Sequence, residues 1–270
     1  IRGYAYAHKN TGRHLITSSI EHPSVLETFR ALEQDGFEVT YLPVDNNGFV
    51  SLAQLGQSIR KDTIMTSIMH ANNEIGTIQN INEIGKICSE KSICFHTDAV
   101  QSFTKAPIDV KKTGLAMMSM AAHKIHGPKG TAALYIKHNT KLKKLITGGH
   151  QESDIMPGTE NVAGIAGFAR AVELSGDEDS QKMAKLRDGL IKMALGINDS
   201  RLNGPMKERL CNNANFSFRN AEGESIMLNL DDKGIAVSTG SACTSQSMEP
   251  SHVLKAIGLR EEWLKGSIRM

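Results

Sequence analysis

The chain has 270 residues, of which 40% are hydrophobic and 22% are charged, and its formal net charge is +2. This length allows one large or two smaller domains, and the composition is that of a globular protein. The charge is too close to zero for nucleic acid or an anionic membrane to be the main partner. No apolar run reaches the roughly 20 residues that a membrane-spanning helix needs.

The cysteines and the two ends of the chain lead to two further expectations, one about the redox state of the thiols and one about the extent of the protein. Cys88, Cys94, Cys211 and Cys243 form no CxxC pair and no zinc-type spacing, so reduced thiols in the cytoplasm are expected. The chain opens in what reads as the end of a helix and stops inside the strand-like "GSIRM". We therefore expect the sequence to be the middle part of a longer protein.

Strand and helix patterns alternate through the first 175 residues. Strands are expected in "HLITSS", "FEVTYLPV", "TIMTSIMHA" and "ICFHTDAV", and near residues 117–120 and 131–136. Helices are expected in "HPSVLETFRALEQDG", with Pro23 near its start and Gly36 after its end, in "SLAQLGQSIR" and in "INEIGKICSEK". Apolar strands that alternate with helices predict an α/β fold with a mainly parallel sheet covered on both faces.

The pattern changes near residues 175–180. A charged helix from Asp177 to about Leu195 is followed by "NNANFSFRN", by a helix in "GESIMLNLDDKG" and by "IAVSTGSACTSQS". We predict a large domain over residues 1–175 and a smaller α+β domain over residues 176–270.

Polar residues that follow the predicted strands are the first candidates for a site, because ligands of open α/β sheets bind beyond the carboxyl ends of the strands. These residues are His22, Asn72, Asn73, Asp98, Gln101, His123 and Lys124. Lys124 is either a solvated loop lysine or an amine that forms a Schiff base with an aldehyde cofactor. Asp98 is either a helix N-cap or a carboxylate that keeps a pyridine nitrogen protonated. A lysine and an aspartate in these two roles are the pairing that pyridoxal phosphate requires.

Seven short motifs occur in a characteristic order: "SSIEHPSV", "MHANNEIGTIQ", "HTDAVQS", "AAHKIHGPKG", "PGTENVAGI", "STGSACTS" and "GSIRM". On these motifs the chain resembles the cysteine desulfurases of the class V aminotransferase group. The resemblance covers essentially the whole chain. It implies the fold type I architecture, pyridoxal phosphate as cofactor, L-cysteine as substrate and a scaffold protein of iron–sulfur cluster assembly as sulfur acceptor. It also implies further segments at both ends, in keeping with the ends that look cut.

The resemblance implies three catalytic residues. Lys124 would hold the cofactor as a Schiff base and move protons, and His22 would stack on the cofactor ring and take part in acid–base steps. Cys243 would receive the sulfur as a persulfide. Its surroundings, "STGSACTSQS", are small and polar, which is typical of an exposed loop that gives a thiol access to substrate.

The resemblance also implies the residues that bind cofactor and substrate, and no metal ion. Asp98 would pair with the ring nitrogen and Gln101 with the ring oxygen, while His123 would bind the phosphate. Arg269 would clamp the substrate carboxylate, with Asn73 close to that carboxylate and to the ring oxygen. Thr159 would reach the phosphate from the neighbouring subunit, so a homodimer is expected.

Two positions depart from the family pattern. Ala121 stands where the family usually has a serine that binds the phosphate, and Met156 stands where it usually has an arginine. A hydrogen bond to a charged group contributes roughly 1.5–3 kcal/mol. We therefore expect weaker retention of the cofactor.

Three alternatives remain open at this point. One is another class V lyase or aminotransferase, such as a selenocysteine lyase, although a transaminase has no use for a cysteine in an exposed loop. Another is a non-catalytic member of the family that serves as a binding partner in sulfur assembly. The weakest is a zinc site through His96, Asp98 and His123, which lacks the usual ligand spacing.

Overall fold

The structure, a computed structural model, describes residues 1–239 and 250–270. The chain groups into two compact units. Unit 1 comprises Ile1–Leu42, Leu52–His70 and Asn80–Ser175, and unit 2 comprises Pro43–Ser51, Ala71–Gln79 and Gly176–Met270. Two short segments from the first third of the chain thus group with the C-terminal part.

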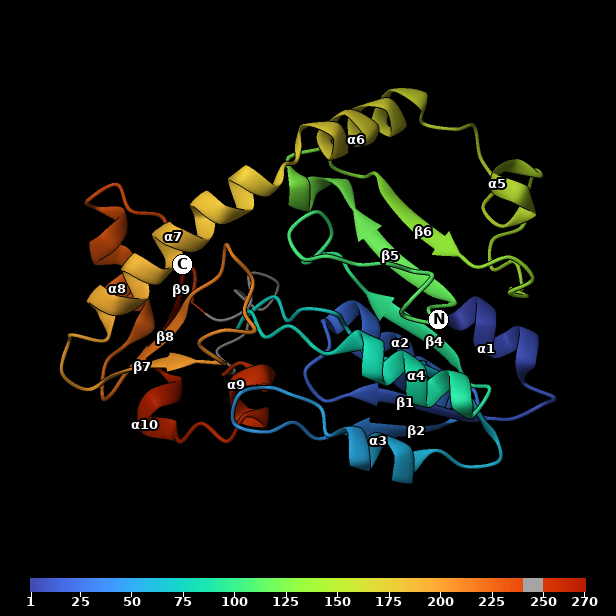
Figure 1. The fold of residues 1–270 in the computed structure, drawn as a ribbon, viewed down its shortest axis with the longest axis horizontal. Helices are drawn as coiled ribbons and strands as arrows, with labels where there is room; N and C mark the ends of the chain where they lie inside the picture. Colours follow the sequence, from blue (N-terminus) through green and yellow to red (C-terminus); the bar gives the residue numbers. More distant parts are fainter. Residues whose placement is uncertain (240–249) are drawn as a thin grey trace. The chain divides into compact units, whose positions relative to one another are not determined.

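Within the described residues, unit 1 contains a six-stranded sheet in the order β2-β1-β3-β4-β5-β6 (Figure 1). The strands are β1 (His14–Ser18), β2 (Glu38–Leu42), β3 (Thr63–Ser67), β4 (Cys94–Asp98), β5 (Met117–Ala121) and β6 (Ala132–Ile136). The first five are parallel, and β6 runs antiparallel to β5. The prediction of a mainly parallel α/β sheet is therefore confirmed.

Helices cover both faces of this sheet. The helices of unit 1 are α1 (Arg2–His8), α2 (Pro23–Gln34), α3 (Leu52–Ser58), α4 (Ile81–Glu90), the 3-10 helix η1 (Ala122–Ile125), α5 (Gln151–Asp154) and α6 (Val162–Leu174). Residues of α1 and α2 share one apolar cluster with Leu15, Met65 and Cys94. On the opposite face Gly85 of α4 packs against Phe95, because neighbouring side chains of a strand point to opposite faces. All residues of β1, β3 and β4 are buried as a result.

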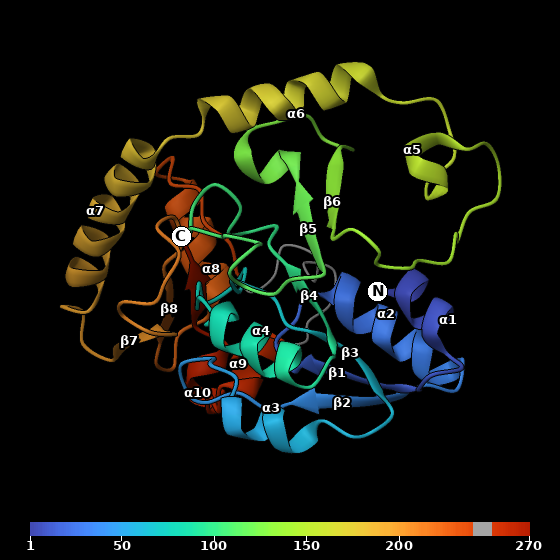
Figure 2. The same cartoon turned by 45° about the vertical axis from the view of Figure 1, so that its right-hand side comes forward.

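Unit 2 contains a three-stranded antiparallel sheet of β7 (Ser200–Asn203), β8 (Asn215–Phe218) and β9 (Ser267–Arg269), which are labelled in Figure 1; β7 and β8 are also labelled in Figure 2. Its helices are α7 (Asp177–Ala194), α8 (Gly223–Asp231), α9 (His252–Ala256) and α10 (Glu261–Leu264). Ile191 and Ala194 of α7 pack against Phe216 of β8 in the apolar core of this unit. The predicted α+β character of the C-terminal part is thus present.

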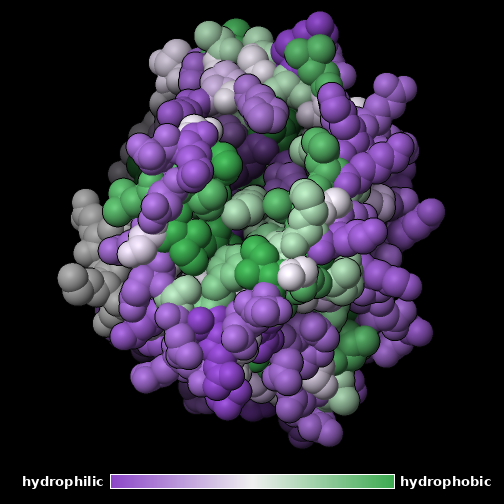
Figure 3. All heavy atoms as spheres, turned by 90° about the vertical axis from the view of Figure 1, so that its left-hand side faces the viewer, coloured by the Kyte–Doolittle hydropathy of each residue, from purple (hydrophilic) through white to green (hydrophobic). Residues whose placement is uncertain are grey.

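Some large apolar side chains remain on the surface. Leu186 and Met193 of α7 and Leu228 of α8 are exposed. A hydrophobic area bordered by hydrophilic residues is visible on the face of the molecule drawn in Figure 3. No helix in residues 1–239 or 250–270 combines the length and the apolar character needed to cross a bilayer.

Candidate active site

Three of the predicted catalytic and cofactor residues follow strands of unit 1. His22 lies in the turn after β1, Asp98 ends β4, and Lys124 lies in η1 directly after β5. Because these strands are parallel, their carboxyl ends share one edge of the sheet. Burial raises the pKa of the Asp98 carboxyl above its ordinary value, while the charges of His22 and Lys124 lower it. The tertiary structure therefore brings these three residues within electrostatic range of one another.

Asp98 has one carboxylate oxygen engaged in a local bond. Its Oδ1 accepts a hydrogen bond from the Val100 amide at 2.9 Å, which is the local capping interaction of a turn. The side chain is buried, and its other oxygen has no hydrogen-bond partner among the residues that the structure describes. A carboxylate held in this way has one oxygen fixed by the protein and one available to a ligand.

The turn that carries His123 and Lys124 is held through its backbone. Ala121 is extended, the residues of η1 turn, and His126 adopts a left-handed conformation with φ 64°. Lys105 Nζ donates a hydrogen bond to the Lys124 carbonyl oxygen at 2.9 Å. The side chains of His123 and Lys124 are exposed in the single chain.

Lys105 was not predicted from the sequence. Its Nζ also donates to the Gln101 carbonyl oxygen at 3.4 Å, so it ties the turn after β4 to the turn after β5. Gln101 itself is half-buried in the turn after β4. A lone lysine in a sequence carries no signal for such a role.

His22 begins α2. Its Nδ1 accepts a hydrogen bond from the Ser24 amide at 3.2 Å and lies 2.8 Å from Ser24 Oγ. The imidazole therefore acts as the N-cap of α2.

Glu21, next to His22, is a further residue that the sequence prediction missed. Its side chain is fully buried, and Oε1 accepts hydrogen bonds from Ser18 Oγ at 2.6 Å and from the Met69 amide at 2.9 Å. These bonds fasten the turn before α2 to the end of β3. Burial raises the pKa of Glu21 to about 8. An acidic residue directly after an apolar strand was the available signal.

The two residues predicted to bind the substrate carboxylate meet in unit 2. Arg269 of β9 donates a hydrogen bond from Nη1 to the Asn73 carbonyl oxygen at 2.9 Å. The Asn213 amide also lies close to this turn, with bonds to the carbonyl oxygens of Asn73 at 3.5 Å and Glu74 at 3.1 Å. The remaining nitrogens of the Arg269 guanidinium have no partner within residues 1–239 and 250–270. They can take a bidentate carboxylate.

The other predicted residues are distributed differently. Thr159 is exposed in the loop between α5 and α6, away from the bonds described above, and Met156 is exposed in the same loop. Cys243 lies outside the described residues. The remaining cysteines, Cys88, Cys94 and Cys211, are buried free thiols. Burial raises the pKa of Cys88 to about 11 and that of Cys94 to about 12, so neither is a ready thiolate.

The zinc alternative finds no support in the geometry of His96. Its Nδ1 lies 2.8 Å from Ser67 Oγ and its Nε2 lies 2.9 Å from Ser119 Oγ, so both ring nitrogens are engaged between neighbouring strands. Burial lowers the pKa of His96 to about 3. In the part of the chain that the structure describes, no cluster of three or more potential ligands could hold a metal ion.

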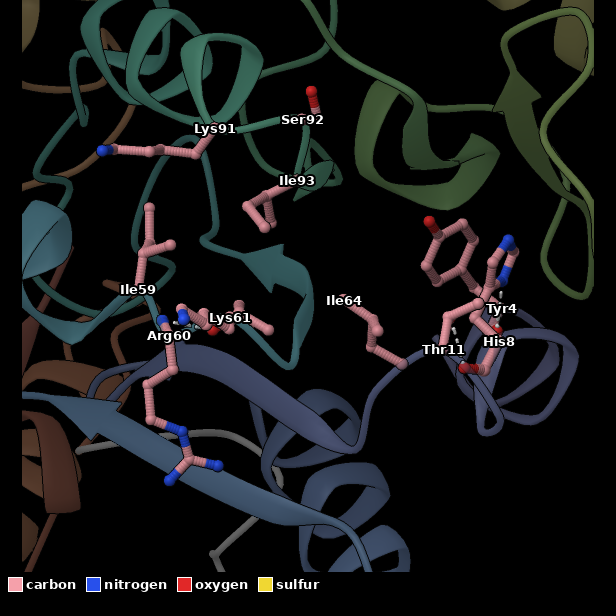
Figure 4. A pocket seen from close by; sticks show the side chains of 11 residues that line it. Tyr4, His8, Thr11, Ile59, Arg60, Lys61, Ile64, Lys91, Ser92 and Ile93 are labelled. Carbon is pink, nitrogen blue, oxygen red and sulfur yellow. Dashed lines mark hydrogen bonds between the residues drawn. The ribbon is translucent and has the colours of Figure 1, made fainter.

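A pocket of about 540 Å³ lies in unit 1, but not at the edge that carries the candidate residues (Figure 4). Its lining includes Thr11 before β1, Thr63 at the start of β3 and Ile93 before β4, which are the amino ends of the strands. Arg60 on its rim is already paired with Glu38 and Asp62. The pocket contains none of the predicted site residues.

The chain is similar to known proteins over its whole length. The sequence profile of the class-V aminotransferases matches residues 1–270. The chain is 53% identical to a cysteine desulfurase IscS of Dictyoglomus turgidum, covering all of this chain and 69% of that protein. It is 52% identical to a cysteine desulfurase IscS of Methanosarcina thermophila, covering all of this chain and 68% of that protein.

Solved structures show the same relationship. A NifS-like protein superposes with a TM-score of 0.90 at 37% identity, covering 99% of this chain and 72% of the other. A structure described as SspA in complex with cysteine superposes with a TM-score of 0.87, also at 37% identity, covering 99% of this chain and 76% of the other. The architecture is that of the fold type I enzymes that depend on pyridoxal phosphate. The chain belongs to the class-V aminotransferase family and, within it, to the cysteine desulfurases.

Proposed function

We propose that this chain takes sulfur from L-cysteine as a persulfide on Cys243 and releases L-alanine, and that the sulfur serves iron–sulfur cluster assembly. The observation that carries the proposal is that His22, Asp98 and Lys124 lie at the carboxyl ends of β1, β4 and β5, which belong to one parallel sheet. Similarity over the whole chain to proteins named cysteine desulfurase supports the choice of substrate.

The described residues fit pyridoxal phosphate. The available oxygen of Asp98 suits a protonated ring nitrogen, which would offset the burial that raises the pKa of this carboxyl. Lys124 supplies the amine for a covalent link from the adjacent turn, and His123 supplies a donor for the phosphate. When bound, pyridoxal phosphate would supply an electron-withdrawing ring that stabilises negative charge at the substrate Cα.

Each protein group then has a separate task. Lys124 Nζ would remove the proton from the substrate Cα and later return a proton to the product. Asp98 would hold the ring nitrogen in its protonated form, Gln101 would bond the ring oxygen, and His22 would cover the ring. Arg269 would bind the substrate carboxylate, because its Nη1 is already fixed by the Asn73 carbonyl oxygen.

Cys243 would perform the sulfur transfer. Its thiolate attacks the substrate sulfur, so that an S–S bond forms as the Cβ–S bond breaks. The electron pair of the broken bond stays on the substrate carbon, where protonation gives the methyl group of L-alanine. The persulfide then passes its outer sulfur to the thiol of an acceptor, for which we propose an iron–sulfur scaffold protein.

We also propose a role for each of the two units and a dimeric assembly. Unit 1 would hold the cofactor, and unit 2, which includes Arg269, would be the smaller domain with Cys243. We also propose a homodimer in which Thr159 reaches the phosphate of the neighbouring site. The exposure of Thr159 and of the nearby apolar residues Val162 and Ile165 on α6 supports such a contact. A cytoplasmic location would keep the thiol of Cys243 reduced.

The variant Cys243→Ser tests the function. We expect it to bind pyridoxal phosphate and L-cysteine, as followed by the visible absorbance of the cofactor, and to release no sulfide under reducing conditions. Cys211→Ala, which changes a buried thiol in unit 2, is the matched control and should keep normal release.

Two results would contradict the proposal. Full sulfide release by Cys243→Ser would indicate direct elimination by a lyase of the selenocysteine lyase kind. A wild-type protein that takes up no pyridoxal phosphate would indicate a non-catalytic member of the family.

A further inference from the structure

Lys124 lies in a short helical segment whose main chain departs from regular helix bonding. η1 has four residues, and the Gly127 amide, three residues after Lys124, bonds the Ala122 carbonyl oxygen at 2.9 Å. Pro128, four residues after Lys124, has no N–H group. The two donors that a continued helix would offer to the Lys124 carbonyl oxygen are therefore not available to it.

A side chain of the neighbouring turn bonds this oxygen instead. Lys105 Nζ donates to the Lys124 carbonyl oxygen at 2.9 Å and to the Gln101 carbonyl oxygen at 3.4 Å. Hydrogen bonds from a charged donor are stronger than those between neutral groups. Gln101 belongs to the turn that follows Asp98, whose carboxyl group is bonded to the Val100 amide of the same turn. The ammonium group of Lys105 thus joins the main chain of Lys124 to the turn that presents Asp98.

The buried side of η1 is held by apolar contacts. Ala122 and Ile125 form a cluster with Phe168 of α6. Phe103, from the turn after β4, packs against the same cluster, and its ring meets that of Phe168 edge to face at a centroid distance of 6.1 Å. Apolar packing is not directional, so it keeps η1 against α6 without fixing the direction of the Lys124 carbonyl group. A hydrogen bond is directional and supplies that constraint.

We propose that Lys105 is a positioning residue for the amine of Lys124, which it holds through the Lys124 main chain. This inference rests on the proposed function, in which Lys124 Nζ removes and returns the proton at the substrate Cα. The Lys124 side chain is exposed and has a flexible four-carbon stem, so the place of its amine depends on how firmly its main chain is held. Loss of the bond from Lys105 slows proton transfer, because a displaced amine meets the Cα proton in the productive geometry less often.

Four substitutions separate the bond from the charge. Lys105→Met removes the donor and keeps an unbranched side chain of similar length, whereas Lys105→Gln keeps an uncharged donor on a shorter stem. Lys105→Arg keeps a charged donor that can bond carbonyl oxygens. Lys129→Met, at an exposed lysine shortly after η1, removes the same charge near the same turn and is the control.

The test has two readouts. The first is the amide hydrogen–deuterium exchange of residues 121–130 in the cofactor-free protein, followed by mass spectrometry. The second is the exchange of the Cα proton of L-alanine with D2O in the holoenzyme, followed by NMR. The second reaction requires proton transfer by Lys124 but no transfer of sulfur.

We expect Lys105→Met to speed the amide exchange and to lower kcat for the exchange of the Cα proton, each about tenfold, the value of one hydrogen bond to a charged group. The KM for L-alanine should stay within about threefold of wild type, because substrate binding is proposed for Arg269 and Asn73 of unit 2. Lys105→Gln should lie between Lys105→Met and wild type. Lys105→Arg and Lys129→Met should behave like wild type in both readouts.

The inference is wrong if Lys105→Met exchanges the Cα proton with the wild-type kcat, or if Lys129→Met slows the exchange as much. It is also wrong if amide exchange rises equally throughout unit 1, since that would indicate a general loss of stability. If Lys105→Met does not fold, Lys105→Gln and Lys105→Arg decide, and equal kcat values for these two overturn the inference. A wild-type protein that takes up no pyridoxal phosphate contradicts the proposed function itself, whereas a normal wild type with unaffected variants contradicts only the role of Lys105.

Discussion

In unit 1 the candidate residues lie at the ends of parallel strands of one sheet, whereas in unit 2 they are joined by a hydrogen bond between residues far apart in the chain. His22, Asp98 and Lys124 lie where β1, β4 and β5 end, and the sheet alone gives them a common edge. Arg269 and Asn73 are 196 positions apart and meet through a side-chain bond to a carbonyl oxygen. The difference indicates that local sequence patterns are enough to predict a site built from strand ends, whereas the pair of Arg269 and Asn73 could be expected only from the resemblance to a family.

The interiors of the two units differ in the same way. One apolar cluster of unit 1 includes Leu15, Phe29 and Met65 from the sheet and its helices. In unit 2 a group of amide side chains is fully buried beside the apolar core: the amide of Asn203 bonds Asn215 Oδ1 and Ser217 Oγ, both at 2.8 Å. We therefore expect unit 2 to depend more strongly on individual polar groups.

The largest expected effect concerns the strand-end site. Lys124→Ala should abolish the borohydride-reducible link between protein and cofactor, together with all turnover. The fold should remain, because the Lys124 side chain is exposed and Lys105 bonds only its carbonyl oxygen. Mass spectrometry after reduction measures the link, and Lys129→Ala in the same turn is the control. A reducible bond that persists in Lys124→Ala would show that another amine holds the cofactor.

The next prediction tests the polar interior of unit 2. Asn215→Ala leaves the Asn203 amide and the Glu74 carbonyl oxygen each short of one bond, so we expect the free energy of unfolding to fall by about 2–4 kcal/mol. Thr113→Val in unit 1 is the matched case, because the buried hydroxyl of Thr113 has no hydrogen-bond partner among the described residues. Loss of this hydroxyl group should leave the free energy of unfolding unchanged or slightly higher. Urea denaturation measures the free energy of unfolding of both variants. Equal losses in Asn215→Ala and Thr113→Val would contradict the contrast between the units.

Glu21 adds a pH-dependent effect to unit 1. Its pKa is about 8 in the folded protein, against 4.5 for an exposed glutamate, so between these values the folded state binds a proton that the unfolded state does not. The stability that this proton confers is complete below pH 4.5 and is lost as the pH rises through 8. Glu21→Gln cannot ionise and keeps the acceptor oxygen for Ser18 and Met69. Its advantage over wild type should therefore grow by about 1–3 kcal/mol between pH 5 and pH 8.

Denaturant titrations at a series of pH values measure this difference. The serine that bonds Glu21 supplies a control, since Ser18→Ala removes a donor without removing the ionisation. The wild-type slope should persist in Ser18→Ala and vanish in Glu21→Gln. Parallel profiles for wild type and Glu21→Gln would mean that Glu21 keeps an ordinary pKa.

The smallest expected effect concerns cofactor retention. Ala121 ends β5 directly before η1, and a serine there could bond the cofactor phosphate. We expect Ala121→Ser to slow the loss of pyridoxal phosphate about tenfold, measured as an off-rate in a protein that contains every phosphate-binding segment. A serine at this position can instead cap η1, which would raise the stability of the cofactor-free protein and leave the off-rate unchanged. That outcome would show that position 121 does not face the phosphate.

Local sequence patterns were enough to predict the order of strands and helices in unit 1 and the polar residues at the strand ends. Both follow from local patterns: the period of apolar residues sets the type of element, and Pro23 and Gly36 mark the limits of α2. A parallel sheet then places its carboxyl ends together without further information. The order of the seven motifs then indicated the family to which the chain is similar.

Contacts between residues far apart in the sequence could be identified only from the tertiary structure. Residues 43–51 and 71–79 group with unit 2, an arrangement that no single boundary near residue 175 can express. The bonds from Ser251 to Glu74 and from Arg269 to Asn73 join residues whose local sequences carry no trace of each other. The burial that raises the pKa of Glu21 likewise depends on packing between β1 and β3. Polar bonds over such separations form only once the chain has folded, since local preferences act over a few residues and a partner across the chain is set by the packing of whole elements.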